Sequence, residues 1–251
     1  MASAFFTALR LLTRLPLRGE DNPDNHLVLN MFAPAGLAIG LVMWLVAYFL
    51  LKACGVLAAA FLAGVAFGPL YWWLTEARNP AGIIWCAGNW RLAEPEEAGG
   101  EAARFRPYWV MLAVQVVFLF RLAATAILVY SERPLWLAAA PLLGMTAQAD
   151  LLLAARAAGP DAGAAPPRLP VVWLTAGGLV IVLGGLAAAG GILKTGLLAG
   201  LLALVLAWAL TPWLGRWVES RCGGVNEHVH GAVREAVELL TLAVGVLAFA
   251  T

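Results

Sequence analysis

Seven long stretches of almost uninterrupted apolar residues constrain the fold of this chain more than any other feature. They run roughly over Met31–Leu51, Ala53–Leu74, Pro107–Tyr130, Pro134–Ala155, Pro170–Gly190, Ile192–Leu214 and Ala232–Ala250. Each is close to the roughly 20 residues that a helix needs to cross the hydrocarbon core of a bilayer. The stretches lack the alternation of barrel strands, and a helix satisfies its own backbone groups in lipid. We therefore predict an all-α integral membrane protein with about seven transmembrane helices.

The composition excludes several other classes of protein. Of the 251 residues, 62% are hydrophobic and only 12% are charged, whereas a soluble domain has about 25% charged residues. A water-soluble enzyme of this length could not bury so much apolar surface, and a disordered chain would be polar. The formal net charge of +1 gives no reason to expect nucleic-acid binding through bulk charge.

The N-terminal segment is amphipathic rather than membrane-spanning. Residues 1–17 combine apolar side chains such as Phe5, Phe6 and Leu9 with the cations Arg10 and Arg14. The segment is too short and too charged to cross a bilayer, and no small-residue cleavage site follows it. We expect an interfacial helix at 1–17, a transmembrane bundle over 31–250, and a single membrane domain over 1–251.

Lysine and arginine are distributed unevenly among the connections. The short connections Lys52–Gly55, Ser131–Pro134 and Gly190–Lys194 carry three of the 16. The N-terminal segment and the long connections Thr75–Arg106, Arg156–Leu169 and Gly215–Gly231, with their flanks, carry twelve. This positive-inside signal predicts an inner (cytoplasmic) membrane protein with a cytoplasmic N-terminus and an external C-terminus. It makes 75–106 the main cytoplasmic loop.

Two ionisable residues, Arg121 and Asp150, fall inside predicted spans. A charge in hydrocarbon is costly, so each should face the bundle interior or a wet cavity. The two could pair across adjacent helices, although their depths differ by about 9 Å at 1.5 Å per residue. Asp150 could instead line a polar pocket that opens to the cytoplasm. In a third interpretation, both residues line the polar path of a small transporter.

The segment that leads into the last apolar stretch is rich in polar residues: Glu227, His228, His230, Arg234, Glu235 and Glu238. Histidines and carboxylates together could hold a divalent metal, with Glu227 and His228 as the candidate ligands. However, the spacing matches no standard zinc pattern. The alternative is a polar entrance to the last helix, with Arg234 and Glu238 paired at i, i+4.

Three sequence features, in order along the chain, resemble one family. They are FFTALRLLTRLPL at Phe5–Leu17, FAPAG at Phe32–Gly36 and GGVNEHVHGAVREAVELL at Gly223–Leu240. All three are similar to the cobalamin synthase, or adenosylcobinamide-GDP ribazoletransferase, family. The resemblance implies a multi-helix membrane enzyme that joins an activated corrinoid to α-ribazole and releases GMP. It also implies magnesium as the cofactor.

The middle of the chain departs from the family pattern. After the second span the family carries a run similar to TGxxHxDGxxDxxDG, of which Thr75 and Gly82 match. Its three aspartate positions fall on Ala81, Trp85 and Gly88, and none of these side chains can ligate magnesium. The resemblance therefore implies that the metal-binding aspartates are lost. We expect the segment to pack as an apolar plug or a short helix without a magnesium site.

Other family positions are retained only in part. In the family's DSRxG run only the arginine survives, as Arg104. The aspartate of its GGxTGD run falls on His228, whereas Glu235 and Glu238 stand where the family has two glutamates. The resemblance makes Arg104, Glu235 and Glu238 the catalytic candidates, and Arg14, Arg104 and Arg106 the candidates for holding phosphates.

Two main functional interpretations follow from these residues. In the first, the chain is a divergent transferase of phosphate-linked groups. In the second, it is an inactive relative that binds a corrinoid or another phosphate-bearing small molecule, or acts as a scaffold. Its expected partners are the lipid bilayer, such a ligand, and other membrane proteins of the corrinoid pathway.

Overall fold

A computed structural model describes residues 1–18, 26–76, 78–89, 101–157, 170–187, 193–222 and 227–249. Within these ranges the regular structure is helical, with no strand. The helices are α1 (Ala2–Leu12), α2 (His26–Asn30), α3 (Phe32–Cys54), α4 (Val56–Leu74), α5 (Arg78–Asn89), α6 (Glu101–Tyr130), the 3₁₀ helix η2 (Pro134–Ala138), α7 (Ala139–Ala157), α8 (Pro170–Ala187), α9 (Leu193–Cys222) and α10 (Glu227–Phe249).

Each predicted apolar stretch falls on one of these helices, which confirms the all-α integral membrane fold. Five segments of the described chain are long and apolar enough to cross a membrane: Leu27–Cys54, Val56–Leu74, Tyr108–Tyr130, Pro134–Ala154 and Lys194–Val218. The apolar part of α8, Trp173–Leu186, is shorter. Helix α10 is long enough, but it carries Arg234, Glu235 and Glu238.

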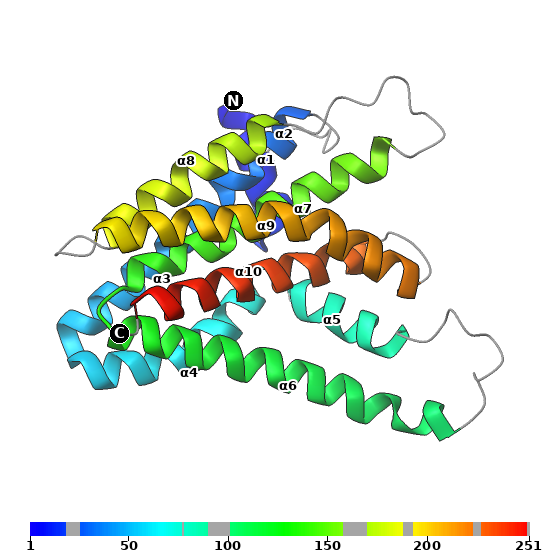
Figure 1. Cartoon of the computed structure of the whole chain (residues 1–251), viewed down its shortest axis with the longest axis horizontal. Coiled ribbons are helices and arrows are strands. Elements are labelled where there is room, and N and C mark those ends of the chain that lie inside the picture. The colour runs from blue at the N-terminus through cyan, green and yellow to red at the C-terminus, as the bar shows by residue number, and fades with distance from the viewer. Residues whose placement is uncertain are drawn as a thin grey trace.

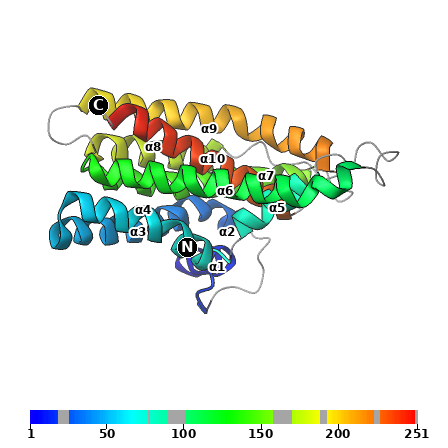
Figure 2. The same cartoon turned by 90° about the horizontal axis from the view of Figure 1, so that it is seen from below.

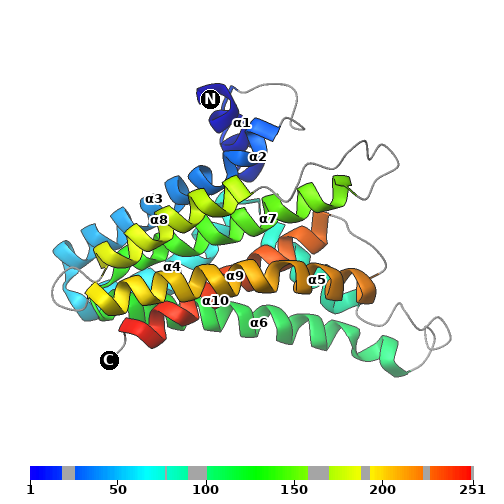
Figure 3. The same ribbon diagram turned by 45° about the horizontal axis from the view of Figure 1, so that its top comes forward.

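The N-terminal helix is shorter than expected, since it ends at Leu12 rather than Leu17. Thr13 is already extended, with φ −139° and ψ 167°. Pro16 disfavours a helical conformation for the residue before it, which limits the helix from its C-terminal side. Ala4, Ala8 and Leu12 are buried, and the helix packs against α2 and α3. Figures 2 and 3 show α1 and α2 standing off from the long helices at the start of α3.

The long helices form an elongated bundle, and their ends gather at its two opposite ends (Figure 1). The α3–α4 turn, the end of α6 and the C-terminus lie at one end, and the start of α6 and the end of α9 lie at the other. The α3–α4 turn consists of one residue, Gly55, with φ 77° and ψ 169°. Glycine adopts this conformation readily because it has no Cβ.

Helices α7 and α10 form the centre of the bundle. The Pro134–Ala154 segment is mostly buried, whereas fewer than half of the residues in the most apolar part of each of the other four segments are buried. Helix α7 packs against α3, α8, α9 and α10, and α10 also packs against α5, α6 and α9. Polar groups on α10 are thereby enclosed by four other helices rather than exposed to lipid.

The arrangement predicts which residues face opposite sides of the membrane. We expect Glu132→Cys and Ser220→Cys, each in a variant without the three native cysteines, to react with a membrane-impermeant maleimide from opposite sides. Glu132 lies next to the end of α6 and Ser220 near the end of α9. Labelling in intact cells and in inverted vesicles measures this, and reaction of both from the same side would contradict the arrangement.

Candidate functional site

The most polar part of the interior lies where α4 ends and α5 begins. The Thr75 hydroxyl and backbone N–H both donate to the carbonyl of Tyr71, at 2.9 Å each, and close the last turn of α4. The chain then turns at Glu76, which has a φ of 58°. Such a conformation is uncommon outside glycine and marks a sharp change of direction. The turn places Tyr71 and Asn79, from two different helices, against α10.

Two glycines allow the helices to approach α10 closely. A Cβ at Gly82 of α5 would overlap the backbone of His228 and Ala232. A Cβ at Gly144 of α7 would overlap the side chain of Glu238. Small residues at such crossings let the backbones of membrane helices come close together. The short side chain of Asn79 on α5 can consequently form a direct hydrogen bond with α10.

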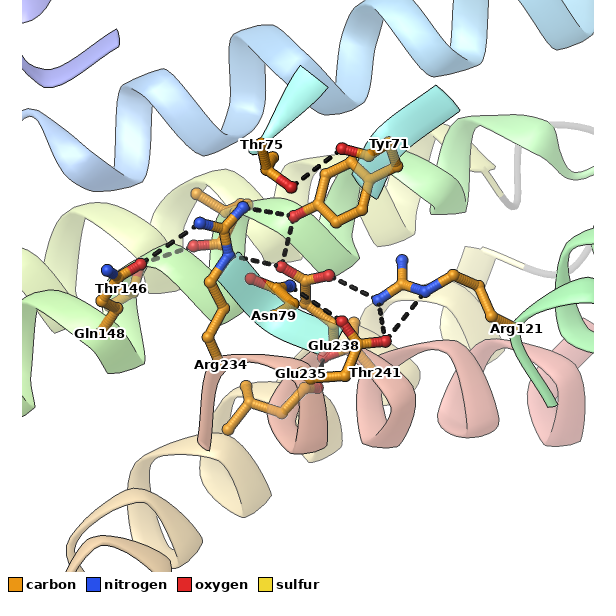
Figure 4. A network of polar contacts seen from close by, with 12 residues as sticks. Tyr71, Thr75, Asn79, Arg121, Thr146, Gln148, Arg234, Glu235, Glu238 and Thr241 are labelled. Atoms are coloured by element: carbon orange, nitrogen blue, oxygen red, sulfur yellow. Dashed lines mark hydrogen bonds and ion pairs between the residues drawn. The ribbon is translucent and has the colours of Figure 1, made fainter. Parts of the chain in front are cut away.

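Arg121 of α6 bridges the two glutamates of α10 (Figure 4). Its Nε and Nη2 donate to Glu235 Oε1 at 3.0 and 2.6 Å. The same Nη2 donates to Glu238 Oε2 at 2.7 Å. Asn79 Nδ2 donates to the other oxygen of Glu235, Oε2, at 2.8 Å. Arg121 is 2% exposed and both glutamates are 0% exposed, so these bonds are shielded from solvent.

Arg234 forms the other half of the network. Its Nε donates to Glu238 Oε1 at 2.9 Å, and its Nη2 donates to the Tyr71 hydroxyl at 2.6 Å. The Tyr71 hydroxyl in turn donates to Glu238 Oε1, and Gln148 of α7 accepts from Arg234 Nη1 at 3.3 Å. Both guanidinium groups lie against the Tyr71 ring, at 4.9 Å for Arg121 and 5.6 Å for Arg234.

The network is electrically balanced, and protein donors reach every carboxylate oxygen in it. Two arginines face two glutamates, and each of the four carboxylate oxygens accepts at least one hydrogen bond. Burying a charge is costly unless it is paired and hydrogen-bonded. Arg121 lies nine residues before Tyr130 at the end of α6, or about 14 Å along the helix. The pairing and the hydrogen bonds therefore make it possible to bury four charges at this depth.

Helix α5 presents an apolar surface beside this network. The segment expected to form a plug or a short helix is helical over Arg78–Asn89. The Trp85 ring stacks on that of His228, with centroids 5.5 Å apart and planes at 22°. The contacts of Asn79, Gly82 and Trp85 follow α10 backwards from Glu235 to His228, so the two helices run antiparallel.

The structure does not bring all predicted site residues together. Arg14 is exposed, with its guanidinium 6.0 Å from the Trp73 ring and its backbone N–H bonded to Leu74. Arg104 and Arg106 lie in the first turns of α6, but their side chains are outside the described part. Along that helix they are 17 and 15 residues from Arg121, or about 26 and 22 Å. They therefore lie far from the two glutamates.

Two sequence interpretations of charged pairs can now be compared with the structure. The pair Arg234–Glu238 at i, i+4 is confirmed, with Nε and Oε1 2.9 Å apart. Arg121 of α6 pairs with Glu235 and Glu238 of the neighbouring helix α10. Asp150 is half-buried.

Sequence reasoning missed Tyr71, Asn79 and Gln148. Their only signal was the presence of polar groups in or beside apolar stretches, and it gave no indication of their partners. The expected metal candidate His228 stacks on Trp85, and the side chain of Glu227 lies outside the described part. Among the residues that the structure describes, no group of three or more histidine, cysteine, aspartate or glutamate side chains could hold a metal.

Comparison with known proteins gives a consistent set of relatives. The chain is 31% identical to the adenosylcobinamide-GDP ribazoletransferase of Pseudomonas entomophila over 258 residues, covering 95% of this chain and 96% of that protein. It is 31% identical to the protein of that name from Ectopseudomonas mendocina over 248 residues, or 94% of this chain. The corresponding values for Pseudomonas putida are 28% over 267 residues, or 98% of this chain. No protein-family model and no solved structure matches the chain.

The balance of the network predicts the effect of removing one charge. Arg121→Met leaves Glu235 buried without its cation, and we expect a loss of about 3–5 kcal/mol in the free energy of unfolding. Arg121→Met/Glu235→Gln removes both charges and should recover part of that loss. Arg216→Met is the control, because Arg216 is exposed and its Nε donates to the Pro212 carbonyl of its own helix, and it should change stability by about 0.5 kcal/mol or less. Reversible unfolding in mixed micelles measures all three, and equal losses for Arg121→Met and Arg216→Met would contradict the balance.

Proposed function

The chain belongs to the adenosylcobinamide-GDP ribazoletransferase (cobalamin synthase) family, and from this premise we propose that it is a member without magnesium-dependent transfer activity. In this proposal the chain keeps the membrane scaffold of the family. It acts by binding a phosphate-bearing corrinoid rather than by joining it to α-ribazole. The observation that carries the proposal is that all four oxygens of Glu235 and Glu238 accept hydrogen bonds from protein donors.

The described residues do not fit a magnesium ion. Magnesium takes oxygen ligands, usually one or two carboxylates together with phosphate oxygens and waters. Ala81, Trp85 and Gly88, which stand at the aspartate positions of the family run, have no side-chain oxygen. The glutamates at the two retained positions already accept hydrogen bonds from Arg121, Arg234, Tyr71 and Asn79 at all four oxygens. We therefore derive no catalytic step through the metal.

The consequence for catalysis is large. Transfer of a phosphate-linked group depends mainly on positioning and on neutralising charge on the phosphate oxygens. A metal ion contributes several kcal/mol to that neutralisation, and each 1.36 kcal/mol corresponds to about tenfold in rate. Internal arginines cannot replace it, because Arg121 and Arg234 are turned toward the glutamates and buried. Scaffold and binding functions do not need this neutralisation.

Binding is proposed at the end of the bundle where α6 begins and α9 ends. Arg104 and Arg106 lie in the first turns of α6, and Arg14 follows α1, where its backbone N–H donates to the carbonyl of Leu74. Arginine forms bidentate, charge-assisted hydrogen bonds with phosphates. Adenosylcobinamide-GDP, the substrate in the name of the relatives, carries a diphosphate that suits such groups. An association with other membrane proteins of the corrinoid pathway would use the same scaffold role.

The proposal places this end in the cytoplasm. The excess of arginine in the N-terminal segment and the long connections supports an inner-membrane protein with its N-terminus inside and its C-terminus outside. A phosphate-bearing corrinoid would then reach the arginines from the cytoplasm.

The transferase reaction itself is the second candidate, because two relatives of that name are 31% identical over at least 94% of this chain. Glu76 or one of the acids of the following connection, Glu94, Glu96 and Glu97, would have to supply metal ligands. This candidate and the proposal differ in turnover, which can be measured directly.

Turnover is the first test. We expect the purified protein in nanodiscs, supplied with magnesium, adenosylcobinamide-GDP and α-ribazole, to form no product above the protein-free background. One of the relatives, assayed under the same conditions, is the positive control. A strain that lacks cobalamin synthase should likewise not be complemented. Magnesium-dependent product formation by this chain would establish the second candidate instead.

Binding is the second test. We expect the protein to bind adenosylcobinamide-GDP without magnesium, and Arg104→Ala to weaken that binding by about 1–3 kcal/mol, the scale of a charge-assisted hydrogen bond. Arg168→Ala, in the Ala/Gly/Pro-rich connection 156–169, is the matched control and should change little. Titration in nanodiscs measures both affinities. Equal effects of the two changes, or no binding by the wild type, would leave only the scaffold role.

A further inference from the structure

The segment that follows α1 is attached to the end of a membrane-spanning helix. The backbone N–H of Arg14 donates to the carbonyl of Leu74 at 2.9 Å. Leu74 is the last residue of the apolar span Val56–Leu74, so this bond holds Arg14 at the level where the hydrocarbon core of the bilayer ends. Helix α1 packs against α2 and α3 beside the start of another span, Leu27–Cys54 (Figure 3). The N-terminal segment therefore lies at the membrane surface.

The backbone around Arg14 is held in place by hydrogen bonds within the protein. The Thr13 hydroxyl donates to the carbonyl of Leu9 at 2.6 Å and accepts the backbone N–H of Leu15 at 3.3 Å. Thr13 is buried, so these two bonds, together with the bond from Arg14 to Leu74, fix the turn after α1. A group whose backbone is already ordered loses less conformational freedom when it binds a ligand.

The Arg14 side chain lies outside the bundle against an aromatic ring. Arg14 is exposed, and its Cζ is 6.0 Å from the centre of the Trp73 ring. Trp73 is itself 60% exposed. A guanidinium attracted to the face of a ring keeps N–H groups that can bind a phosphate bidentately. Within the described part of the chain, no carboxylate pairs with Arg14. The guanidinium is therefore available to an anion from outside the protein.

Apolar side chains are exposed on the same segment. One face of α1, which includes Ala4 and Ala8, is buried against the rest of the protein. Phe6 and Leu15 are exposed. At the boundary between headgroups and acyl chains, apolar side chains beside cations bind anionic lipid through both buried area and charge. The segment thus offers a contact for each part of a phospholipid, the phosphate and the beginning of the acyl chains.

We propose that Arg14 and Trp73 form a surface site for the phosphate group of an anionic phospholipid. Exposed Arg18, four residues further along the same segment, adds positive charge. The inference goes beyond the proposed function, in which Arg14 is one of three arginines near the bound corrinoid. Here the partner of Arg14 is a lipid of the membrane itself, and Arg104 and Arg106 remain for the corrinoid. The bound lipid would hold the segment after α1 against the end of α4.

Quenching of Trp73 fluorescence by brominated lipids tests the site. The wild type and Trp73→Phe are reconstituted in phosphatidylcholine vesicles that contain either brominated phosphatidylglycerol or brominated phosphatidylcholine. The difference between the two proteins isolates Trp73 from the other tryptophans among the 11 of the chain. We expect brominated phosphatidylglycerol to quench Trp73 more strongly than brominated phosphatidylcholine, because its anionic headgroup is held beside this ring.

The variants of Arg14 measure its part in this preference. Arg14→Gln, compared with Arg14→Gln/Trp73→Phe, should lower the preference for phosphatidylglycerol about fivefold, or about 1 kcal/mol, the scale for one arginine near a membrane surface. Arg14→Lys keeps the charge and should keep more of the preference than Arg14→Gln. Arg216→Gln is the matched control, because it removes the same charge from an exposed position on α9 and should leave the quenching of Trp73 unchanged.

Three results would overturn the inference. The first is equal quenching of wild-type Trp73 by the two lipids. The second is a preference that survives in Arg14→Gln, as expected if an acid such as Glu76 or Glu20 held the arginine. The third is loss of the lipid quenching when adenosylcobinamide-GDP is added, which would assign Arg14 to the corrinoid. The measurement needs neither turnover nor a corrinoid, so the proposed function and this inference can fail separately.

Discussion

Four charges buried among five helices are the condition on which the packing of this protein depends. The buried carboxylates of Glu235 and Glu238 are compensated by Arg121, which pairs with both, and by Arg234, which pairs with Glu238. Arg234 lies on α10 itself, whereas Arg121 comes from α6, so neutrality requires α6 beside α10 at one register. Such a buried set adds little net stability compared with well-packed apolar residues, but losing one member is severe. The network therefore contributes more to specifying the arrangement of the helices than to the stability of the fold.

Close packing by small residues makes that arrangement possible. Lipid gives no hydrophobic drive for helix association, so membrane helices rely on contact and hydrogen bonds. Gly82 brings α5 onto α10, and Gly144 leaves the space that Glu238 fills on α7. Farther along α10, Trp136 Nε1 donates to the carbonyl of Thr241 at 2.8 Å. The polar contacts and the close approaches therefore fix the same register of α10 against α7.

The apolar stretches predicted the helices well because a helix in contact with lipid requires a long run of apolar residues. The stretches did not define where the helices end. Helix α6 begins at Glu101 and α9 continues to Cys222, since polar residues extend both helices beyond the apolar part. The site was less predictable. Arg121 and Glu235 are 114 residues apart, and a single sequence does not show which helices are neighbours. Tyr71 and Asn79 both reach the network because the chain turns at Glu76. The sequence did not predict this turn, because the residue at that position is neither glycine nor proline.

Two carboxylate oxygens that converge on a guanidinium cannot hold a metal ion at the same position. A catalytic metal site keeps some coordination positions open, and its acids are held so that their lone pairs face the ion. In this chain the corresponding lone pairs face guanidinium, phenol and amide donors from four helices. The same glutamates that could support chemistry with an ion instead fix the position of α10. The fold needs only that the charges of the buried glutamates be balanced, and arginines of the same chain can do this. The reaction needs a balancing cation that can exchange its ligands. The family scaffold can therefore persist in a chain that has lost the metal.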